Sequence, residues 1–233
     1  MTEKAKNGID GMYGVGYDEI KEYPRFGLRT AAQAINLHKV LTIPFCLLCM
    51  FFNNNWTLHP ALYTVLHGSY TICYLISQYA FPPKNFEIQM PFSQYIAALL
   101  SLAAYWIAPW IVASRIRETN VLICCLSVAL TAIGTCVCFV SQAQLYFTLA
   151  NSKPKLISSG MFKYSRNPNY VGEVLIYSGF ALMSCGAWQP WVVNLLFWLG
   201  IFLPNAAKKD KSLSRHEGWE KYKQHSGKFF PGF

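Results

Sequence analysis

The stretch "YVGEVLIYSGFALMSCGAWQPWVVNLLFWLGIFLP", residues 170–204, indicates the fold class of this chain. Its two apolar segments, 170–187 and 190–204, are separated by a tight "WQP" turn. A helix that spans a membrane needs about 20 mostly apolar residues. We therefore predict that the two segments form a helical hairpin that crosses the membrane and returns.

Four earlier segments have a similar character. Three are continuous apolar runs, residues 60–81, 95–113 and 121–140, and a shorter one at 40–52 contains Pro44. Together with the hairpin they predict an all-α, polytopic membrane helical bundle of about six transmembrane helices. We expect a polar N-terminal arm at 1–37, transmembrane helices 1–4 at 38–140, and a cofactor-site region with the hairpin and an interfacial tail helix at 141–233.

The composition supports a membrane protein. Charged residues make up 13% of the chain and hydrophobic residues 53%, whereas a soluble domain usually carries about 25% charged residues. The aromatic share of 16% suits side chains that lie at membrane interfaces. We infer that much of the surface faces lipid.

The positive charges are distributed unevenly. With six spans, 18 of the 20 Lys and Arg residues fall on the side that holds both termini, and Arg115 and Arg117 fall opposite. By the positive-inside rule the basic side faces the cytosol, or the matrix in a mitochondrial membrane. We expect the endoplasmic reticulum or the mitochondrial inner membrane, and no nucleic-acid partner, because the net charge of +9 reflects topology.

The cysteines and the N-terminal arm exclude other classes. All eight cysteines lie in apolar runs, and no second pair or nearby His completes a zinc set around Cys46 and Cys49. We expect neither a metal nor a disulfide framework. The arm has no apolar core of a secretory signal, and we expect it to contact a protein partner in a larger membrane complex.

A polar cluster marks the start of the fifth predicted span, in "YSRNPNYVGEVLIY", residues 164–177. Asn167 and Pro168 are typical of a helix start, where Asn caps and Pro tolerates the first position. Helix N-termini favour anions, and the guanidinium of Arg166 can grip a phosphate or carboxylate. Residues 166, 169, 170 and 173 have helical spacing and can line one face.

Glu173 is the hardest of these residues to explain structurally. Arg166 and Asn167 could instead be a headgroup anchor and a cap, but a carboxylate inside a span is a functional-site hypothesis by default. Gly172 beside it would allow another helix or a ligand to approach closely. Gln142 and Gln144, at the end of the fourth span, could line the same pocket or face water.

The tail "KKDKSLSRHEGWEKYKQHSGKFFPGF" begins where the sixth span ends. Ser214 and Glu217 have the spacing of a capping box, which predicts a short helix over 215–224. Trp219 and Tyr222 are three residues apart on that helix and are suited to the membrane interface. Because the hairpin returns, the tail lies on the side of Arg166 and could close over it.

Residues 141–233 resemble the C-terminal half of the steroid 5α-reductase-like membrane proteins, in "LISSGMFKYSRNPNYVGEVLIYSGFAL" and the tail. The wider group includes sterol C14-reductases and the isoprenylcysteine and phospholipid methyltransferases. Its motif is usually Arg-His-Pro followed by x-Tyr-x-Gly. Here Asn167 replaces the His, while Asn169 to Glu173 is similar to the reductases. Asp210 and Lys211 stand where the methyltransferases carry a Glu pair.

The resemblance implies a membrane-embedded reductase that delivers hydride from NADPH to a double bond of a steroid or other lipid. Glu173 would orient the cofactor or assist proton transfer, and Tyr177 is a candidate proton donor. The implied cofactor contacts are Tyr164, Arg166, Asn167, Asn169, Tyr170, Gly172, Asp210, Arg215 and Tyr222. The alternatives are a methyltransferase that uses S-adenosylmethionine, and a structural subunit that binds no cofactor.

Overall fold

The computed structural model describes residues 29–83, 89–151 and 156–230. Its described residues are almost entirely helical, which confirms the all-α prediction. The helices are α2 (Ala31–Phe52), α3 (Leu58–Ala80), α4 (Phe92–Ala103), α5 (Ile107–Arg115), α6 (Val121–Asn151), α7 (Pro168–Leu182), α8 (Gln189–Phe197), α9 (Leu203–Leu213) and α10 (Trp219–His225). A π-helical segment, Trp198–Phe202, joins α8 to α9, and 3₁₀ turns occupy Ala104–Trp106 and Gly160–Phe162.

Four helical segments are long and apolar enough to cross a membrane, which indicates an integral membrane protein. They are Ala31–Phe52, Phe92–Arg115, Val121–Ala150 and Gln189–Leu213. No more than 33% of each apolar window is buried within the chain, and the rest presents side chains such as Phe51, Leu100 and Leu196 outward. Such a surface matches lipid rather than water.

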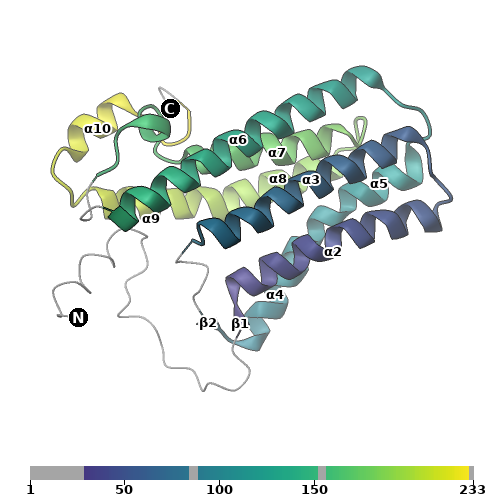
Figure 1. The fold of residues 1–233 in the computed structure, drawn as a ribbon, viewed down its shortest axis with the longest axis horizontal. Helices are drawn as coiled ribbons and strands as arrows, with labels where there is room; N and C mark the ends of the chain where they lie inside the picture. Colours follow the sequence, from purple (N-terminus) through teal and green to yellow (C-terminus); the bar gives the residue numbers. More distant parts are fainter. Residues whose placement is uncertain (1–28, 84–88, 152–155, 231–233) are drawn as a thin grey trace.

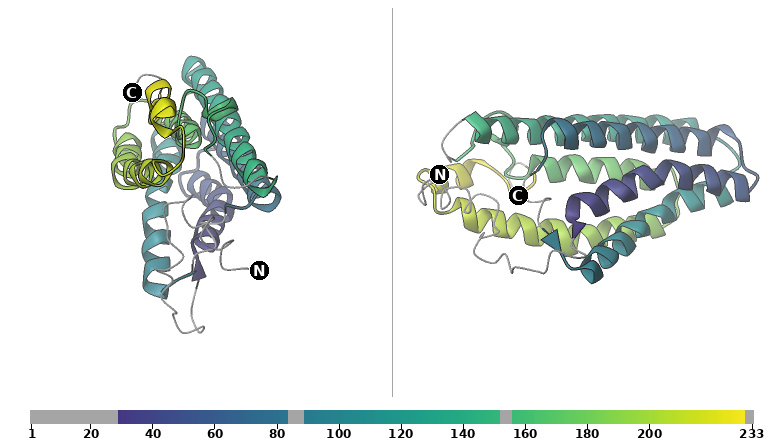
Figure 2. Two further views of the ribbon diagram at one scale, coloured as in Figure 1. Left: turned by 90° about the vertical axis from the view of Figure 1, so that its left-hand side faces the viewer. Right: turned by 60° about the horizontal axis from the view of Figure 1, so that its bottom comes forward.

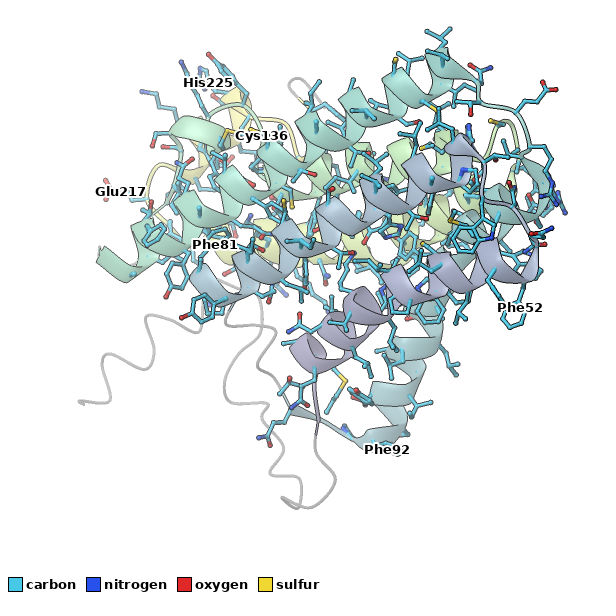
Figure 3. All side chains as sticks on the ribbon, turned by 45° about the vertical axis from the view of Figure 1, so that its right-hand side comes forward. Phe52, Phe81, Phe92, Cys136, Glu217 and His225 are labelled. Atoms are coloured by element: carbon cyan, nitrogen blue, oxygen red, sulfur yellow. The ribbon has the colours of Figure 1, made fainter. Side chains whose placement is uncertain are left out.

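The helices run along one long axis, with α3, α6 and α7 close together (Figure 1). The short turns α2–α3, α5–α6 and α7–α8 gather at one end, and α9, α10 and the start of α7 lie at the other (Figures 1 and 2). Figure 3 labels Phe52 at the first end, and Glu217 and His225 at the second. The second end, where Arg166 and the tail lie, is called the basic end below.

Glycines allow α6 and α7 to pack with their backbones in contact. A Cβ at Gly172 would lie 2.6 Å from the backbone N of Cys138 and 2.6 Å from the backbone O of Gly134. Small residues permit this close approach of helices in membranes. The prediction that Gly172 admits a neighbouring helix is therefore confirmed, and its partner is α6.

The first helix begins earlier than the predicted span. Thr30 and Gln33 form a capping box, with Gln33 N donating to Thr30 Oγ1 at 3.2 Å, and the helix runs unbroken from Ala31 through Pro44. The segment 29–30 (β1) pairs antiparallel with 89–90 (β2), so that Thr30 faces Gln89. Residues 1–28, which include most of the predicted arm and its partner contacts, lie outside the described residues.

The predicted capping box in the tail is wrong. Because α9 continues to Leu213, Ser214 becomes its C-cap and donates its hydroxyl to the carbonyl of Lys211 at 2.9 Å. Gly218 has φ +81°, a left-handed conformation that suits glycine, and α10 begins only at Trp219. The last long helix therefore extends beyond Pro204 as far as Leu213.

Candidate functional site

Arg166 connects the start of α7 with the end of the chain. Its side chain is 7% exposed, and its Nε and Nη2 donate to Asp210 Oδ1 and Oδ2 at 2.9 and 3.2 Å. The remaining nitrogen, Nη1, donates to the carbonyl of Ser226 and to its hydroxyl. The guanidinium also lies 5.6 Å from the ring centre of Trp219. All three nitrogens thus bind groups of the chain itself.

The backbone strengthens the same connection. Arg166 N donates to Gly227 O at 2.9 Å, and Gly227 N donates to Tyr164 O at 3.0 Å. Asn167 is the N-cap residue of α7, but its side chain does not cap the helix: Nδ2 donates to Lys228 O at 2.9 Å. The predicted helix start at Asn167 and Pro168 is therefore confirmed, but the side chain of Asn167 binds the C-terminal segment instead of capping the helix. We call residues 226–229 the C-terminal strap.

Trp219 and Tyr222 are buried, which corrects their predicted place at the membrane interface. They are 5% and 6% exposed and pack with Leu213 and Leu156. The hydroxyl of Tyr222 donates to Phe162 O at 2.7 Å, and burial raises the pKa of Tyr222 to about 12. The tail helix is thus docked onto the loop that precedes α7.

The other predicted cofactor residues point to different surroundings. Tyr164 is exposed, with Lys163 over its ring. Tyr170 stacks on Phe202 with ring centres 4.9 Å apart. Arg215 is exposed and donates to the hydroxyl of Ser212 at 3.1 Å. Asn169 is half-buried in the first turn of α7.

Contacts from α9, α10 and the strap engage several donors at the basic end in this conformation. Arg166 is neutralised by Asp210, Asn167 binds Lys228, and Tyr222 binds Phe162. A dinucleotide needs several donors directed at its phosphates. Of the residues predicted to hold NADPH, Arg166, Asn167 and Tyr222 therefore have donors engaged by the chain in this conformation.

Deeper in the bundle, α7 meets a lysine from α2. The ammonium of Lys39 donates to the hydroxyl of Tyr177 at 3.1 Å, and Lys39 is 2% exposed. Glu173, one turn before Tyr177 on α7, lies within electrostatic range of Lys39. The structure therefore brings both predicted catalytic residues to one buried cation.

Tyrosines surround this cation. Lys39 Nζ lies 4.3 Å from the ring centre of Tyr70 and 5.3 Å from that of Tyr74, within the range of cation–π attraction. Tyr105 stacks on Tyr177 with ring centres 4.2 Å apart. We call Lys39, Tyr70, Tyr74, Glu173 and Tyr177 the inner cluster.

A cavity opens beside the inner cluster. It has a volume of about 300 Å³ and lies between α7, α8 and the π-helical segment. Its lining is mostly apolar and aromatic, with Tyr177, Ser178 and Asn194 as polar groups: Tyr105, Val174, Tyr177, Ser178, Trp191, Asn194, Leu195, Trp198 and Phe202. Ligand sites typically combine such apolar walls with few polar groups, and π-helical turns are frequent at functional sites.

Sequence reasoning missed Lys39, Tyr70 and Tyr74. The signal for Lys39 was its place beside an apolar run, but nothing local connects it with Tyr177, 138 residues away. Of the two glutamines, Gln144 holds the loop before α7, because its Oε1 accepts from Met161 N and its Nε2 donates to Ser159 O, each at 2.9 Å. Gln142 donates to Cys138 Sγ at 3.5 Å.

Comparison with known families identifies the larger part of the chain. Residues 83–226, which are more than half of the sequence, match the family described as "Protein of unknown function (DUF1295)". The chain belongs to the DUF1295 family. The DUF1295 region begins well before the segment that carries the reductase resemblance. Within the DUF1295 region lie Arg166, Glu173, Tyr177 and Asp210. Lys39 and α3 precede it. No curated protein matches the chain significantly.

Proposed function

We propose that this chain is a membrane-embedded enzyme that reduces a carbon–carbon double bond of a steroid or other lipid, with Tyr177 as the proton donor. The observation that carries the proposal is the 3.1 Å hydrogen bond from Lys39 to Tyr177, at a tyrosine that also lines the apolar cavity. An ionisable side chain this deep in a membrane protein favours function over structure. The resemblance to the reductases supplies the reaction class.

Reduction adds a proton to one carbon of the double bond and a hydride to the other. In the proton half, the O–H bond of Tyr177 breaks, a C–H bond forms on the lipid, and a phenolate remains. Lys39 stabilises that phenolate by its hydrogen bond, and Glu173 balances the charge of Lys39. A reduced nicotinamide dinucleotide, the cofactor that the resemblance implies, would supply the hydride when bound.

The cavity suits an apolar part of the lipid. Trp191, Trp198 and Phe202 offer flat apolar surfaces, and Tyr177 and Asn194 offer polar contacts at its wall. At about 300 Å³ the cavity is at the small end of the range for ligand sites. It would hold a ring system or a chain segment rather than a whole lipid.

Turnover tests this assignment. The purified chain in lipid nanodiscs is incubated with NADPH and a panel of enone sterols and polyprenyl lipids, and saturated products are detected by mass spectrometry. Tyr177→Phe should lower turnover by about 100-fold or more, the usual scale of general acid catalysis. Tyr79→Phe, at a residue that is 92% exposed, should leave turnover unchanged. Full turnover by Tyr177→Phe would exclude the assignment.

A second candidate is a catalytically silent structural subunit of a larger membrane complex. It is favoured by the strap, which engages the residues predicted to bind a cofactor. Calorimetry with NADPH and with S-adenosylmethionine separates the candidates. NADPH binding supports the reductase, S-adenosylmethionine binding supports the methyltransferase alternative, and binding of neither together with migration in a large assembly on a native gel supports the subunit.

For the topology we propose six spans, with α3 and α7 added to the four segments above and the basic end facing the cytosol or the matrix. The membrane would be the endoplasmic reticulum or the mitochondrial inner membrane. The exposed cations Lys163 and Lys211 belong to the loop before α7 and to α9, at the basic end, while Arg117 donates to Asn53 O in the α2–α3 turn at the other end. Glu217→Cys and Arg117→Cys should then react with an impermeant maleimide from opposite sides of sealed vesicles.

A further inference from the structure

Four polar side chains form a stripe on one face of α3. His67, Thr71, Tyr74 and Gln78 recur at helical spacing. In each, one side-chain atom is buried without a hydrogen-bond partner within the described chain: His67 Nε2, Thr71 Oγ1, Tyr74 Oη and Gln78 Nε2. His67 and Thr71 are each 1% exposed. We call these four residues the α3 stripe.

Such a stripe is costly if it is dry. An unpaired buried polar group destabilises a fold, and groups of this kind are normally partnered by protein or by ordered water. The stripe also lowers the hydropathy of α3. This helix has 23 residues and no charged side chain, yet it is not among the four segments that are apolar enough to span a membrane. A shared polar partner that runs along the face would satisfy all four groups.

The stripe leads from the basic end to the inner cluster. Gln78 lies one turn before Phe81, and Figure 3 labels Phe81 toward the end that holds Glu217 and His225. Midway, Tyr74 lies under the ammonium of Lys39. Eleven residues of helix span about 16 Å, roughly half of a hydrocarbon core of about 30 Å.

The inner end of the stripe also has polar surroundings. His67 Nδ1 lies 3.2 Å from the hydroxyl of Tyr63. A cavity of about 10 Å³ is lined by Tyr63, His67 and Tyr177, among others. That volume is close to the minimum needed for one water molecule.

We propose that a file of internal water molecules follows the α3 stripe from Gln78 to His67 and returns protons to Tyr177 through Lys39. The ammonium of Lys39 gives a proton to the phenolate oxygen of Tyr177, and the resulting amine takes a proton from the water file. Bulk water at the basic end resupplies the file. The water file stands on the stripe itself, while its role in returning protons rests on the proposed function.

Hydroxyl-radical footprinting tests the file without any substrate. X-ray pulses generate radicals from water, and internal water oxidises the side chains beside it even when these are buried. With the full chain in nanodiscs, mass spectrometry should find Tyr74 and Tyr177 oxidised. Met50 is the internal control, because it is 4% exposed, lies away from the stripe, and is chemically more reactive than tyrosine.

A pair of matched variants tests whether the stripe holds the water. Thr71→Val keeps the shape and removes one polar group, and should lower the oxidation of Tyr74 and Tyr177 at least threefold. Thr135→Val is the control on α6, since its hydroxyl is bonded to Thr131 O at 2.6 Å, and should leave the oxidation unchanged. Oxidation of Tyr74 no greater than that of Met50, or an unchanged Thr71→Val pattern, would overturn the proposal.

The footprinting experiment tests the water file and the turnover experiment tests the proton donor, so one proposal can be contradicted while the other stands. If Tyr177→Phe retains full turnover while Tyr74 and Tyr177 are oxidised, the water file stands and the proton donor is wrong. If turnover depends on Tyr177 but the stripe is dry, the proton donor stands and the path is wrong.

Discussion

The guanidinium of Arg166 and the carboxylate of Asp210 face each other with two parallel hydrogen bonds, 2.9 Å from Nε to Oδ1 and 3.2 Å from Nη2 to Oδ2. This geometry joins the start of α7 to α9, 44 residues later. Lys228 approaches the same carboxylate at 3.9 Å. The fold of the basic end therefore depends on one half-buried anion.

Removing that anion should destabilise the chain. Asp210→Asn leaves the buried cation of Arg166 without its counter-charge, and breaking a buried pair in this way typically costs about 3–5 kcal/mol. We expect a lower midpoint of thermal unfolding in detergent, measured by intrinsic fluorescence. Lys211→Asn changes the exposed neighbour and should leave the midpoint unchanged. Equal midpoints for the wild type and Asp210→Asn would show that the pair does not hold the tail.

The contact between α6 and α7 predicts a strong effect at a glycine. Gly172→Ala places a methyl group 2.6 Å from backbone atoms of Cys138 and Gly134, and overpacking usually costs about 1–3 kcal/mol. Thermal unfolding should show a clear loss of stability. Gly200→Ala is the matched control, because a Cβ there meets nothing within 4 Å. An equal response of the two variants would argue against the close helix contact.

The double variant Lys39→Met with Glu173→Gln should separate stability from activity. It replaces both charges of a buried pair with uncharged side chains, a change that is often neutral or stabilising in protein interiors. Turnover should nevertheless fall, since the donor to Tyr177 is lost. Unfolding midpoint and turnover are measured on the same preparation, and a fall in the midpoint with unchanged turnover would assign Lys39 a structural role.

Tyr222 gives the basic end a dependence on alkaline pH. Its pKa in the folded chain is about 12, above the ordinary value of 10.0, because burial disfavours the phenolate. The folded state thus holds this proton more tightly than the unfolded state does. The contribution to stability is complete below pH 10 and is lost as the pH rises toward 12. The unfolding midpoint should fall less steeply over this range in Tyr222→Phe than in the wild type.

The Tyr222→Phe variant has a second expected effect. It loses the hydrogen bond to Phe162 O, and at neutral pH this should cost about 0.5–1.5 kcal/mol. Tyr79→Phe, at an exposed tyrosine, serves as the control at each pH. Parallel curves for Tyr222→Phe and the wild type above pH 10 would contradict the assignment.

The sequence was informative where the signal is local. Apolar runs separated by turns predicted the helices, and Pro168 marked the start of α7. The hairpin of 170–204 predicted that the tail returns to the side of Arg166, and the structure places Asp210 against it. Helix ends were harder, because the helical pattern of α9 continues through charged residues to Leu213 and removes Ser214 from the role of N-cap.

The inner cluster could not be predicted because its parts come from distant segments. Lys39 lies directly after the predicted polar arm, 1–37, and the helix that begins after the capping box at Thr30 carries it into the bundle. The α3 stripe was hidden for another reason: its members are uncharged, and a count of charges in a span does not register them. The inner cluster and the α3 stripe both depend on which helix faces pack against one another, and this packing is visible only in the folded chain.

The strap also has a consequence for how the chain is made. Arg166 leaves the ribosome before Asp210 and Ser226, the residues that satisfy it. Until residues 210–226 have been made, the start of α7 carries a cation whose partners do not yet exist, so the basic end can close only after the strap has emerged. A chain that stops before Ser226 would keep Asp210 and the contacts of α10, but Nη1 of Arg166 would lose both of its acceptors.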